Sequence, residues 1–284
     1  MSGPGQALSP PVALTIAGSD SGAGAGLQAD LKTFAALGVF GTSAVTAVTA
    51  QNTVGVQAVH VIPPPMVEAQ IAAVMDDLRP AAAKTGMLAT ASTMAVVAGR
   101  ARRGELPPLV VDPVMVSSTG SRLLDSEAER AYLDSLFPYA TVVTPNLREA
   151  SLLVGRDLAD LDDMAKAARQ LHETGAGLVV VKGGHLPGAE AIDVVFDGQG
   201  LHHLRSAWVD TRNVHGTGCT LSAATAAWMA LGLEPLPALQ RAKDFVAGAL
   251  VRASRWTLGG GHGPLDHFGW AAEHGGPAET GPLT

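Results

Sequence analysis

The 284-residue chain is 47% hydrophobic and 16% charged, which argues against a disordered or coiled-coil protein and leaves one large α/β domain or two small ones. Its formal net charge of −7, with no concentrated basic face, argues against binding to nucleic acid. The single cysteine, Cys219, a first segment without a signal-peptide pattern and the lack of a bilayer-spanning apolar run predict a soluble cytoplasmic protein that does not bind membranes.

Short β-branched runs alternate with longer helical patterns between two Gly- and Pro-rich ends, 1–11 and 271–284, which are predicted as flexible tails. Several of the runs are apolar throughout, as is typical of strands covered on both faces. The alternation predicts a mainly parallel sheet between two layers of helices. Strands are predicted at 12–17, 44–49, 81–84, 109–111, 141–144, 178–181 and 192–196, with extra strands or edge hairpins at 56–62 and 200–206. Helices are predicted at 27–37, 65–77, 92–103, 126–137, 162–173, 217–231 and 236–256.

Polar residues that follow the strands are the candidates for a site, because ligands of such sheets bind beyond the carboxyl ends of the strands. The first strand leads into a glycine-rich turn, Gly18 to Gly26. The third glycine and the following acidic residue do not have the spacing of a dinucleotide-binding turn, which disfavours a dehydrogenase. Two interpretations remain: the glycines permit close packing, or a flat substrate lies against the backbone while Asp30 reaches it from the helix.

Gln51 and Met87 follow the next two strands. The amide of Gln51 can donate and accept at once, which matches a heteroaromatic ring carrying an amine and a ring nitrogen. A solvated turn is the alternative for Gln51. The thioether of Met87 can lie over a ring face, although a core position is the alternative.

Asp112, Glu149 and Lys182 also stand at strand ends. Glu149 comes three residues after Asn146, a spacing that predicts a helix-capping pair. The other interpretation is that Asp112 and Glu149 hold hydrated Mg²⁺ together with substrate phosphates. Lys182 is a candidate phosphate contact, with a solvated lysine as the alternative.

The segment from Gly216 to Cys219 precedes an apolar helical pattern. Gly216 and Gly218, on either side of Thr217, leave the backbone N–H groups of the first turn unobstructed, which predicts an anion hole for a transferring phosphoryl group. The helix start is also expected to favour the thiolate of Cys219. Cys219 is then an inert core residue, the nucleophile of a thiol hydrolase, or a base that assists a substrate hydroxyl. The chain contains neither a P-loop nor the motifs of protein kinases.

Taken in order, these segments resemble the hydroxymethylpyrimidine/phosphomethylpyrimidine kinases of thiamine biosynthesis, within the ribokinase-like superfamily. The resemblance covers residues 12–268, which are predicted to form one kinase domain. Each motif is modest alone, but seven in register are specific. The matching segments are 17–22, 49–53, 84–88, 112–115, 144–149, 181–185 and 215–220, followed by 261–264 and 267–268.

The resemblance implies a ribokinase-like three-layer α/β/α fold with a mainly parallel central sheet, no separate lid domain and a homodimer. It also implies phosphorylation, dependent on ATP and Mg²⁺, of 4-amino-5-hydroxymethyl-2-methylpyrimidine and then of its monophosphate. Carried over residue by residue, the implied roles are Gly18, Asp30, Gln51 and Met87 around the pyrimidine, Asn146 and Lys182 at the nucleotide, Asp112 and Glu149 at Mg²⁺, Gly216, Thr217 and Gly218 as anion hole, and Cys219 as base.

One loop departs from the family pattern. Residues 118–121 read Ser-Thr-Gly-Ser where members often have Lys-Ser-Gly-Asp, so a basic side chain near the nucleotide phosphates is missing and the second phosphorylation is left open. A pyridoxal kinase of the same fold is the first alternative, against which Cys219 and Gln51 favour the pyrimidine. A non-catalytic pyrimidine sensor is the second, against which Asp112, Glu149 and the intact glycine turn argue.

Overall fold

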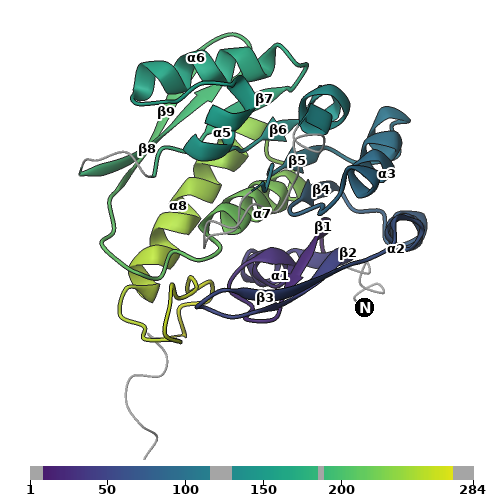
Figure 1. Cartoon of the computed structure of the whole chain (residues 1–284), viewed down its shortest axis with the longest axis horizontal. Helices are drawn as coiled ribbons and strands as arrows, with labels where there is room; N and C mark the ends of the chain where they lie inside the picture. Colours follow the sequence, from purple (N-terminus) through teal and green to yellow (C-terminus); the bar gives the residue numbers. More distant parts are fainter. Residues whose placement is uncertain (1–8, 116–129, 185–188, 271–284) are drawn as a thin grey trace, which may run out of the picture.

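The structure is a computed structural model that describes residues 9–115, 130–184 and 189–270 (Figure 1). Apart from residues 9–11, the two predicted tails lie outside the described residues. The divergent loop 118–121 and the start of the helix predicted at 126–137 lie outside them as well.

Within these ranges, nine strands form one sheet in the order β3-β2-β1-β4-β5-β6-β7-β8-β9. The six strands from β2 to β7 run parallel, whereas β3 pairs antiparallel with β2, and β8 pairs antiparallel with β7 and β9. The mainly parallel sheet and the two extra strands predicted from the sequence are therefore confirmed. The strands are β1 (Val12–Asp20), β2 (Phe40–Gln51), β3 (Val56–Val61), β4 (Ala82–Thr85), β5 (Leu109–Val111), β6 (Val142–Val143), β7 (Leu178–Val181), β8 (Glu190–Phe196) and β9 (Leu201–Ala207).

The helices follow the predicted pattern, and one further helix begins at the predicted capping pair. They are α1 (Gly26–Ala36), α2 (Pro64–Asp77), α3 (Ala91–Arg102), α5 (Leu147–Val154), α6 (Leu161–His172), α7 (Thr217–Ala230) and α8 (Pro235–Ala253). In the described part of the segment predicted as a helix at 126–137, residues 130 and 131 are α-helical, and the chain continues as a π-helical turn, Tyr132–Leu136, and a 3₁₀ turn, Phe137–Tyr139. Pro138 lies in the 3₁₀ turn, just beyond the predicted end of the helix.

Alternate residues of the central strands point to opposite faces, and both faces are buried. In β5, Leu109 and Val111 belong to the core under α2, α3, α5 and α6, whereas Val110 belongs to the core under α1, α7 and α8. The buried face of α7 is rich in alanine, which lets α7 pack closely on the sheet and on α8. In Figure 1 these two helices, green to yellow, lie side by side across the molecule.

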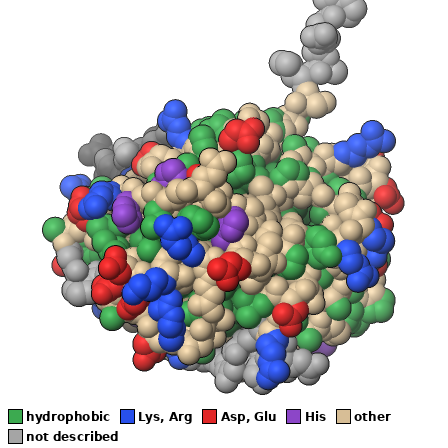
Figure 2. Space-filling model, turned by 90° about the horizontal axis from the view of Figure 1, so that it is seen from above, with side chains coloured by type: hydrophobic (Ala, Val, Ile, Leu, Met, Phe, Trp, Pro, Cys, Tyr) green, Lys and Arg blue, Asp and Glu red, His purple; other side chains and the backbone are tan. Residues whose placement is uncertain are grey.

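Charges of both signs are interspersed on the face seen in Figure 2, where lysine and arginine side chains alternate with carboxylates. In the part of the chain that the structure describes, no helix is both long enough and apolar enough to cross a bilayer.

Candidate active site

Five polar residues stand at the carboxyl ends of strands, on the same side of the sheet, because the central strands are parallel. Gln51 ends β2, Thr85 ends β4, Asp112 follows β5, Asn146 follows β6 and Lys182 follows β7. The first turn of α7 lies at the same edge, since a Cβ on its Gly218 would stand 3.1 Å from Lys182 Nζ and 3.7 Å from Asp112 Oδ2. These residues therefore lie in a row along the carboxyl ends of the strands from β2 to β7.

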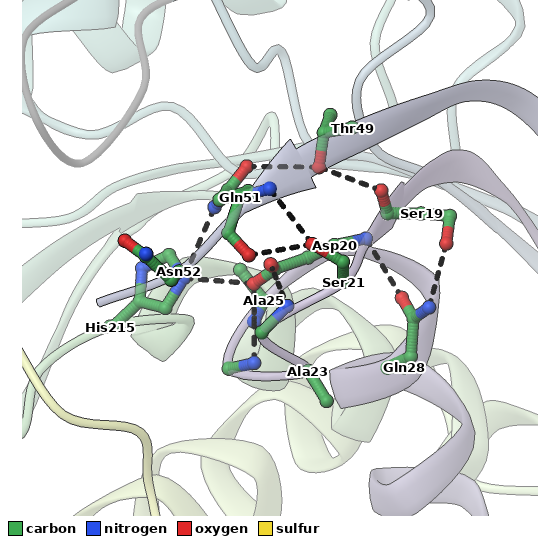
Figure 3. A network of polar contacts seen from close by, with 12 residues as sticks. Ser19, Asp20, Ser21, Ala23, Ala25, Gln28, Thr49, Gln51, Asn52 and His215 are labelled. Carbon is green, nitrogen blue, oxygen red and sulfur yellow. Dashed lines mark hydrogen bonds and ion pairs between the residues drawn. The ribbon is translucent and has the colours of Figure 1, made fainter. Parts of the chain in front are cut away.

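Asp20, at the end of β1, holds the glycine-rich turn in place (Figure 3). Its Oδ1 accepts from the Gly22 N–H at 2.8 Å, and its Oδ2 accepts from the Ala25 N–H at 2.9 Å and lies 2.9 Å from His215 Nε2. Burial raises the pKa of Asp20, but the hydrogen bonds from His215 and from these backbone amides outweigh burial and bring the pKa below its ordinary value. Asp20 is therefore an ionised carboxylate that ties the turn to the residue preceding Gly216.

The glycines of this turn permit close packing, as one of the two interpretations predicted. Gly216 has φ +85°, and a Cβ there would overlap the carbonyl oxygen of Gly24, so the turn lies directly on the start of α7. Gly18 stands at the register shift between β1 and β2, and a Cβ on it would come within 2.8 Å of Met87 Cε. Gly18 and Met87, both predicted at the pyrimidine, are therefore neighbours.

Gln51 belongs to the same network as Asp20 (Figure 3). Its backbone exchanges two hydrogen bonds with the Ser21 hydroxyl, at 2.6 and 2.8 Å. Its side-chain amide lies 3.3 Å from His215 Nε2 at one end and 3.3 Å from Thr49 Oγ1 at the other. The amide predicted to hold the ring and the turn predicted to hold phosphate are thus joined through His215.

Asp30 lies where it was not expected. Its side chain is fully buried, with Lys84 Nζ 2.9 and 2.8 Å from its two oxygens and with the Thr15 hydroxyl donating at 2.6 Å. Burial lowers the pKa of Lys84, but the charge and hydrogen bond of Asp30, together with the charges of Cys219 and Asp112, outweigh burial and bring the pKa above its ordinary value. This position does not favour the direct substrate contact that the resemblance implies. Instead, Lys84 Nζ lies 3.0 Å from where a Cβ on Gly86 would stand, so the ion pair underlies the segment carrying Met87.

Cys219 lies in the first turn of α7, next to Thr217 and Gly218, and is partly exposed. Burial raises the pKa of its thiol to about 11, which outweighs the lowering by the Lys84 ammonium, and the charges of Asp30 and Asp112 add to the rise. The prediction that the helix start favours the thiolate is therefore wrong for the free chain, because burial and two carboxylates oppose it. At neutral pH the thiol is protonated.

Lys182 and Asp112 form an ion pair against the α7 turn, with 3.0 Å between Nζ and Oδ1. Asp112 is almost fully buried, and the hydroxyls of Thr144 and Ser222 donate to it at 3.2 and 3.4 Å. A cation beside the first turn of a helix is a suitable arrangement for phosphate.

The backbone around Lys182 is fixed by a second buried ion pair that the sequence did not reveal. Asp193 in β8 accepts from the Gly183 N–H at 3.0 Å and pairs with Lys243 Nζ of α8 at 2.8 Å. Both side chains look like surface residues in the sequence, because nothing local shows that the strand and the helix bury them against each other.

Asn146 and Glu149 form the predicted capping pair at the start of α5. The Asn146 side chain accepts from the Glu149 N–H at 2.9 Å, and the Glu149 carboxylate accepts from the Asn146 N–H at 2.8 Å. Burial raises the pKa of Glu149 to about 7, while Lys182 lowers it and Asp112 raises it. A buried carboxylate of this kind is favoured in its charged form by a nearby cation.

The carboxylates of Asp112 and Glu149 fit only one type of Mg²⁺ site. Among the residues for which coordinates are described, no group of three His, Cys, Asp or Glu side chains could hold a metal. Mg²⁺ commonly takes one or two protein carboxylates and completes its shell with water and substrate phosphates. Asp112 and Glu149 fit that type, with a bound nucleotide present.

His267 contacts the first turn of α7, with its Nε2 3.0 Å from Thr220 Oγ1. Burial lowers the pKa of His267 to about 4 from 6.5, so the imidazole is neutral in the folded chain. Between these values the unfolded chain binds more protons, and stability from this group is lost as the pH falls below 6.5.

We expect the free energy of unfolding of the parent, relative to that of a His267→Gln variant, to fall by roughly 2 kcal/mol between pH 6.5 and pH 5. Urea unfolding of both proteins at both pH values measures this difference. Glu149, whose raised pKa acts with the opposite sign throughout this range, is common to both proteins and cancels. Equal pH slopes for parent and variant would contradict the prediction.

Comparison with known proteins adds a family to this geometry. A family model described as phosphomethylpyrimidine kinase matches residues 20–266. A hydroxymethylpyrimidine/phosphomethylpyrimidine kinase of Rhizobium meliloti is 51% identical over 259 residues, covering 90% of this chain and 97% of the relative.

Two solved structures share the fold. The phosphomethylpyrimidine kinase of Clostridium difficile is 38% identical with a TM-score of 0.75, covering 84% of this chain and 99% of that one. A pyridoxal kinase of Bacillus subtilis, solved as an ADP complex, is 41% identical with a TM-score of 0.85, covering 92% and 99%. These similarities confirm the predicted ribokinase-like three-layer architecture.

Proposed function

The chain belongs to the phosphomethylpyrimidine kinase family, and from that premise we propose that it is an ATP-dependent kinase of thiamine biosynthesis. Its proposed substrates are 4-amino-5-hydroxymethyl-2-methylpyrimidine and then the monophosphate of that compound. The observation that supports the proposal best is the continuity from Gln51 through His215 to Gly216, because the amide proposed to bind the ring then lies next to the turn proposed to bind phosphate.

Phosphoryl transfer depends mainly on positioning and on electrostatic stabilisation. Gln51 orients the ring, with Gly18 and Met87 against it, so that the hydroxymethyl oxygen points towards the α7 turn. The backbone of Gly216, Thr217 and Gly218 stabilises the transferring group, and Cys219 in its thiolate form accepts the hydroxyl proton.

The nucleotide lies along the carboxyl ends of the later strands, near Asn146 and Lys182. When the nucleotide binds, the Lys182 ammonium pairs with phosphate and gives up its present partner, the Asp112 carboxylate. Asp112 and Glu149 are the residues that would hold Mg²⁺, which neutralises charge on the nucleotide phosphates when it is bound.

The proposal also includes a single kinase domain over residues 12–268, a cytoplasmic location and a homodimer. Apolar side chains left exposed on the β2–β3 edge of the sheet support the dimer: Phe40, Val48, Val59 and Val61. Sedimentation of the chain as a dimer, and as a monomer when Val59 is replaced by lysine, is the test of that part.

A pyridoxal kinase is the second candidate, favoured by the pyridoxal kinase structure of TM-score 0.85. Both substrates are methylated aza-aromatic rings that carry hydroxymethyl groups. The two candidates differ in the ring edge that Gln51 must recognise, because only the pyrimidine presents an amine next to a ring nitrogen.

Mixing the chain with ATP, Mg²⁺ and the amino pyrimidine is expected to release ADP and to form the monophosphate, then the diphosphate. Chromatography of the products at successive times separates the two steps. Pyridoxal in place of the pyrimidine is the matched control and is expected to have the lower kcat/KM. A higher value for pyridoxal would select the second candidate, and pyrimidine binding without ADP release would indicate a sensor.

A further inference from the structure

The hydrogen bonds around Gln51 determine which way its amide faces (Figure 3). Asp20 Oδ2 lies 2.9 Å from His215 Nε2 and also accepts from the N–H groups of Ala25 and Gly24, at 2.9 and 3.2 Å. An ionised carboxylate can only accept hydrogen bonds. The contact between Asp20 and His215 therefore requires a hydrogen on His215 Nε2.

A hydrogen on Nε2 creates a conflict with Gln51 as its amide is placed. Gln51 Nε2 lies 3.3 Å from His215 Nε2, so two donors would face each other. At the other end, Gln51 Oε1 lies 3.3 Å from Thr49 Oγ1, but the single hydroxyl hydrogen of Thr49 is already donated to the Ser19 carbonyl at 2.9 Å. At that end one hydroxyl hydrogen would have to serve two oxygens, of which the Gln51 oxygen is the more distant.

A half-turn of the amide removes both conflicts. The two ends of a glutamine amide have nearly the same shape, so their identities follow from the hydrogen-bond network. With Oε1 towards His215, that oxygen shares the Nε2–H with Asp20 Oδ2 and is the more distant of the two acceptors, at 3.3 Å against 2.9 Å. With Nε2 towards Thr49, the amide donates to Oγ1 while Thr49 still donates to Ser19. Every donor then faces an acceptor.

We propose that His215 and Thr49 are specificity-determining positioning residues, which hold the Gln51 amide with its oxygen on the His215 side. This inference rests on the proposed function, since it concerns the ring that Gln51 would bind. After these bonds, Oε1 keeps one lone pair and Nε2 keeps one hydrogen. They match an exocyclic amine on the His215 side and a ring nitrogen acceptor on the Thr49 side.

This direction also orients the reacting group. In a 4-amino-5-hydroxymethylpyrimidine, the carbon bearing the hydroxymethyl group is the neighbour of the carbon bearing the amine, on the side away from the paired ring nitrogen. With the amine on the His215 side, the hydroxymethyl group lies further in that direction, at Gly216 and the α7 turn. The opposite amide orientation would direct it past Thr49, away from the anion hole.

Substrate selectivity tests the proposal. The 4-oxo analogue of the pyrimidine presents an acceptor and a ring N–H, the reverse of the pattern that the locked amide accepts. The quantity to be measured is the ratio of kcat/KM for the amino substrate to kcat/KM for the oxo analogue. This ratio is expected to fall about tenfold in His215→Phe, which frees the amide to turn, and several-fold in Thr49→Val. Thr49→Ser, which keeps the hydroxyl, is the matched control and is expected to keep the parental ratio.

A second measurement does not need active variants. Long-range ¹H–¹⁵N NMR correlation on the parent is expected to show a proton on His215 Nε2. An unprotonated Nε2, or a parental selectivity ratio in folded Thr49→Val, would overturn the proposal. A parent that phosphorylates neither pyrimidine would instead refute the proposed function, and the NMR result would still decide the amide orientation.

Discussion

Replacing Cys219 by alanine is expected to lower kcat by about 10²–10⁴-fold, with little change in KM for the pyrimidine, because proton acceptance acts in the transition state and not in ground-state binding. Steady-state kinetics with the amino pyrimidine varied at saturating ATP separates the two parameters. A Cys219→Ala enzyme that turns over at the parental rate would show that the base is another group.

The pH dependence of kcat/KM of the parent is a second test of Cys219 as the base. The pKa of the Cys219 thiol is about 11 in the free chain, so the thiolate is a small fraction at pH 7. We expect kcat/KM to rise about tenfold per pH unit above neutrality, because each unit raises the thiolate fraction by that factor until the pKa is approached. Cys219→Ser keeps a small polar side chain that does not ionise in this range, so the ratio of the parental kcat/KM to that of Cys219→Ser is expected to rise by the same factor, and the titration of Glu149 near pH 7 is common to both proteins.

The second large effect is expected on stability. Lys84→Met should lower the free energy of unfolding by about 3–5 kcal/mol, because it leaves the Asp30 carboxylate buried without its cation. Urea unfolding at pH 7 measures the change. The double variant Lys84→Met, Asp30→Leu removes both charges and should regain most of the loss.

The comparison of single and double variants separates charge from packing. If the loss came from the shape of the methionine, the double variant would be at least as unstable as the single one. A single variant as stable as the parent would mean that Asp30 takes up a proton at little cost. The Thr15 hydroxyl, which donates to Asp30, is present in every variant.

Patterns local to the sequence determined much of the fold. Apolar runs predicted β5 and β7 with the observed bounds, and the Asn146–Glu149 spacing predicted the capping pair at α5. The segment predicted as a helix at 126–137 is helical in its described part, but the sequence did not predict that residues 132–136 form a π-helical turn. The order of the motifs also identified the residues that lie at the carboxyl ends of the strands.

Only the tertiary structure determined the charge states of those residues and the residues that they contact. His215 and Asp20 are 195 positions apart, and Lys243 and Asp193 are 50 apart, so no local pattern pairs them. The Cys219 thiol and the buried Asp30 differ from expectation for the same reason. A pKa and a contact depend on burial and on charges supplied by distant segments, whereas strands, turns and caps depend on neighbours along the chain.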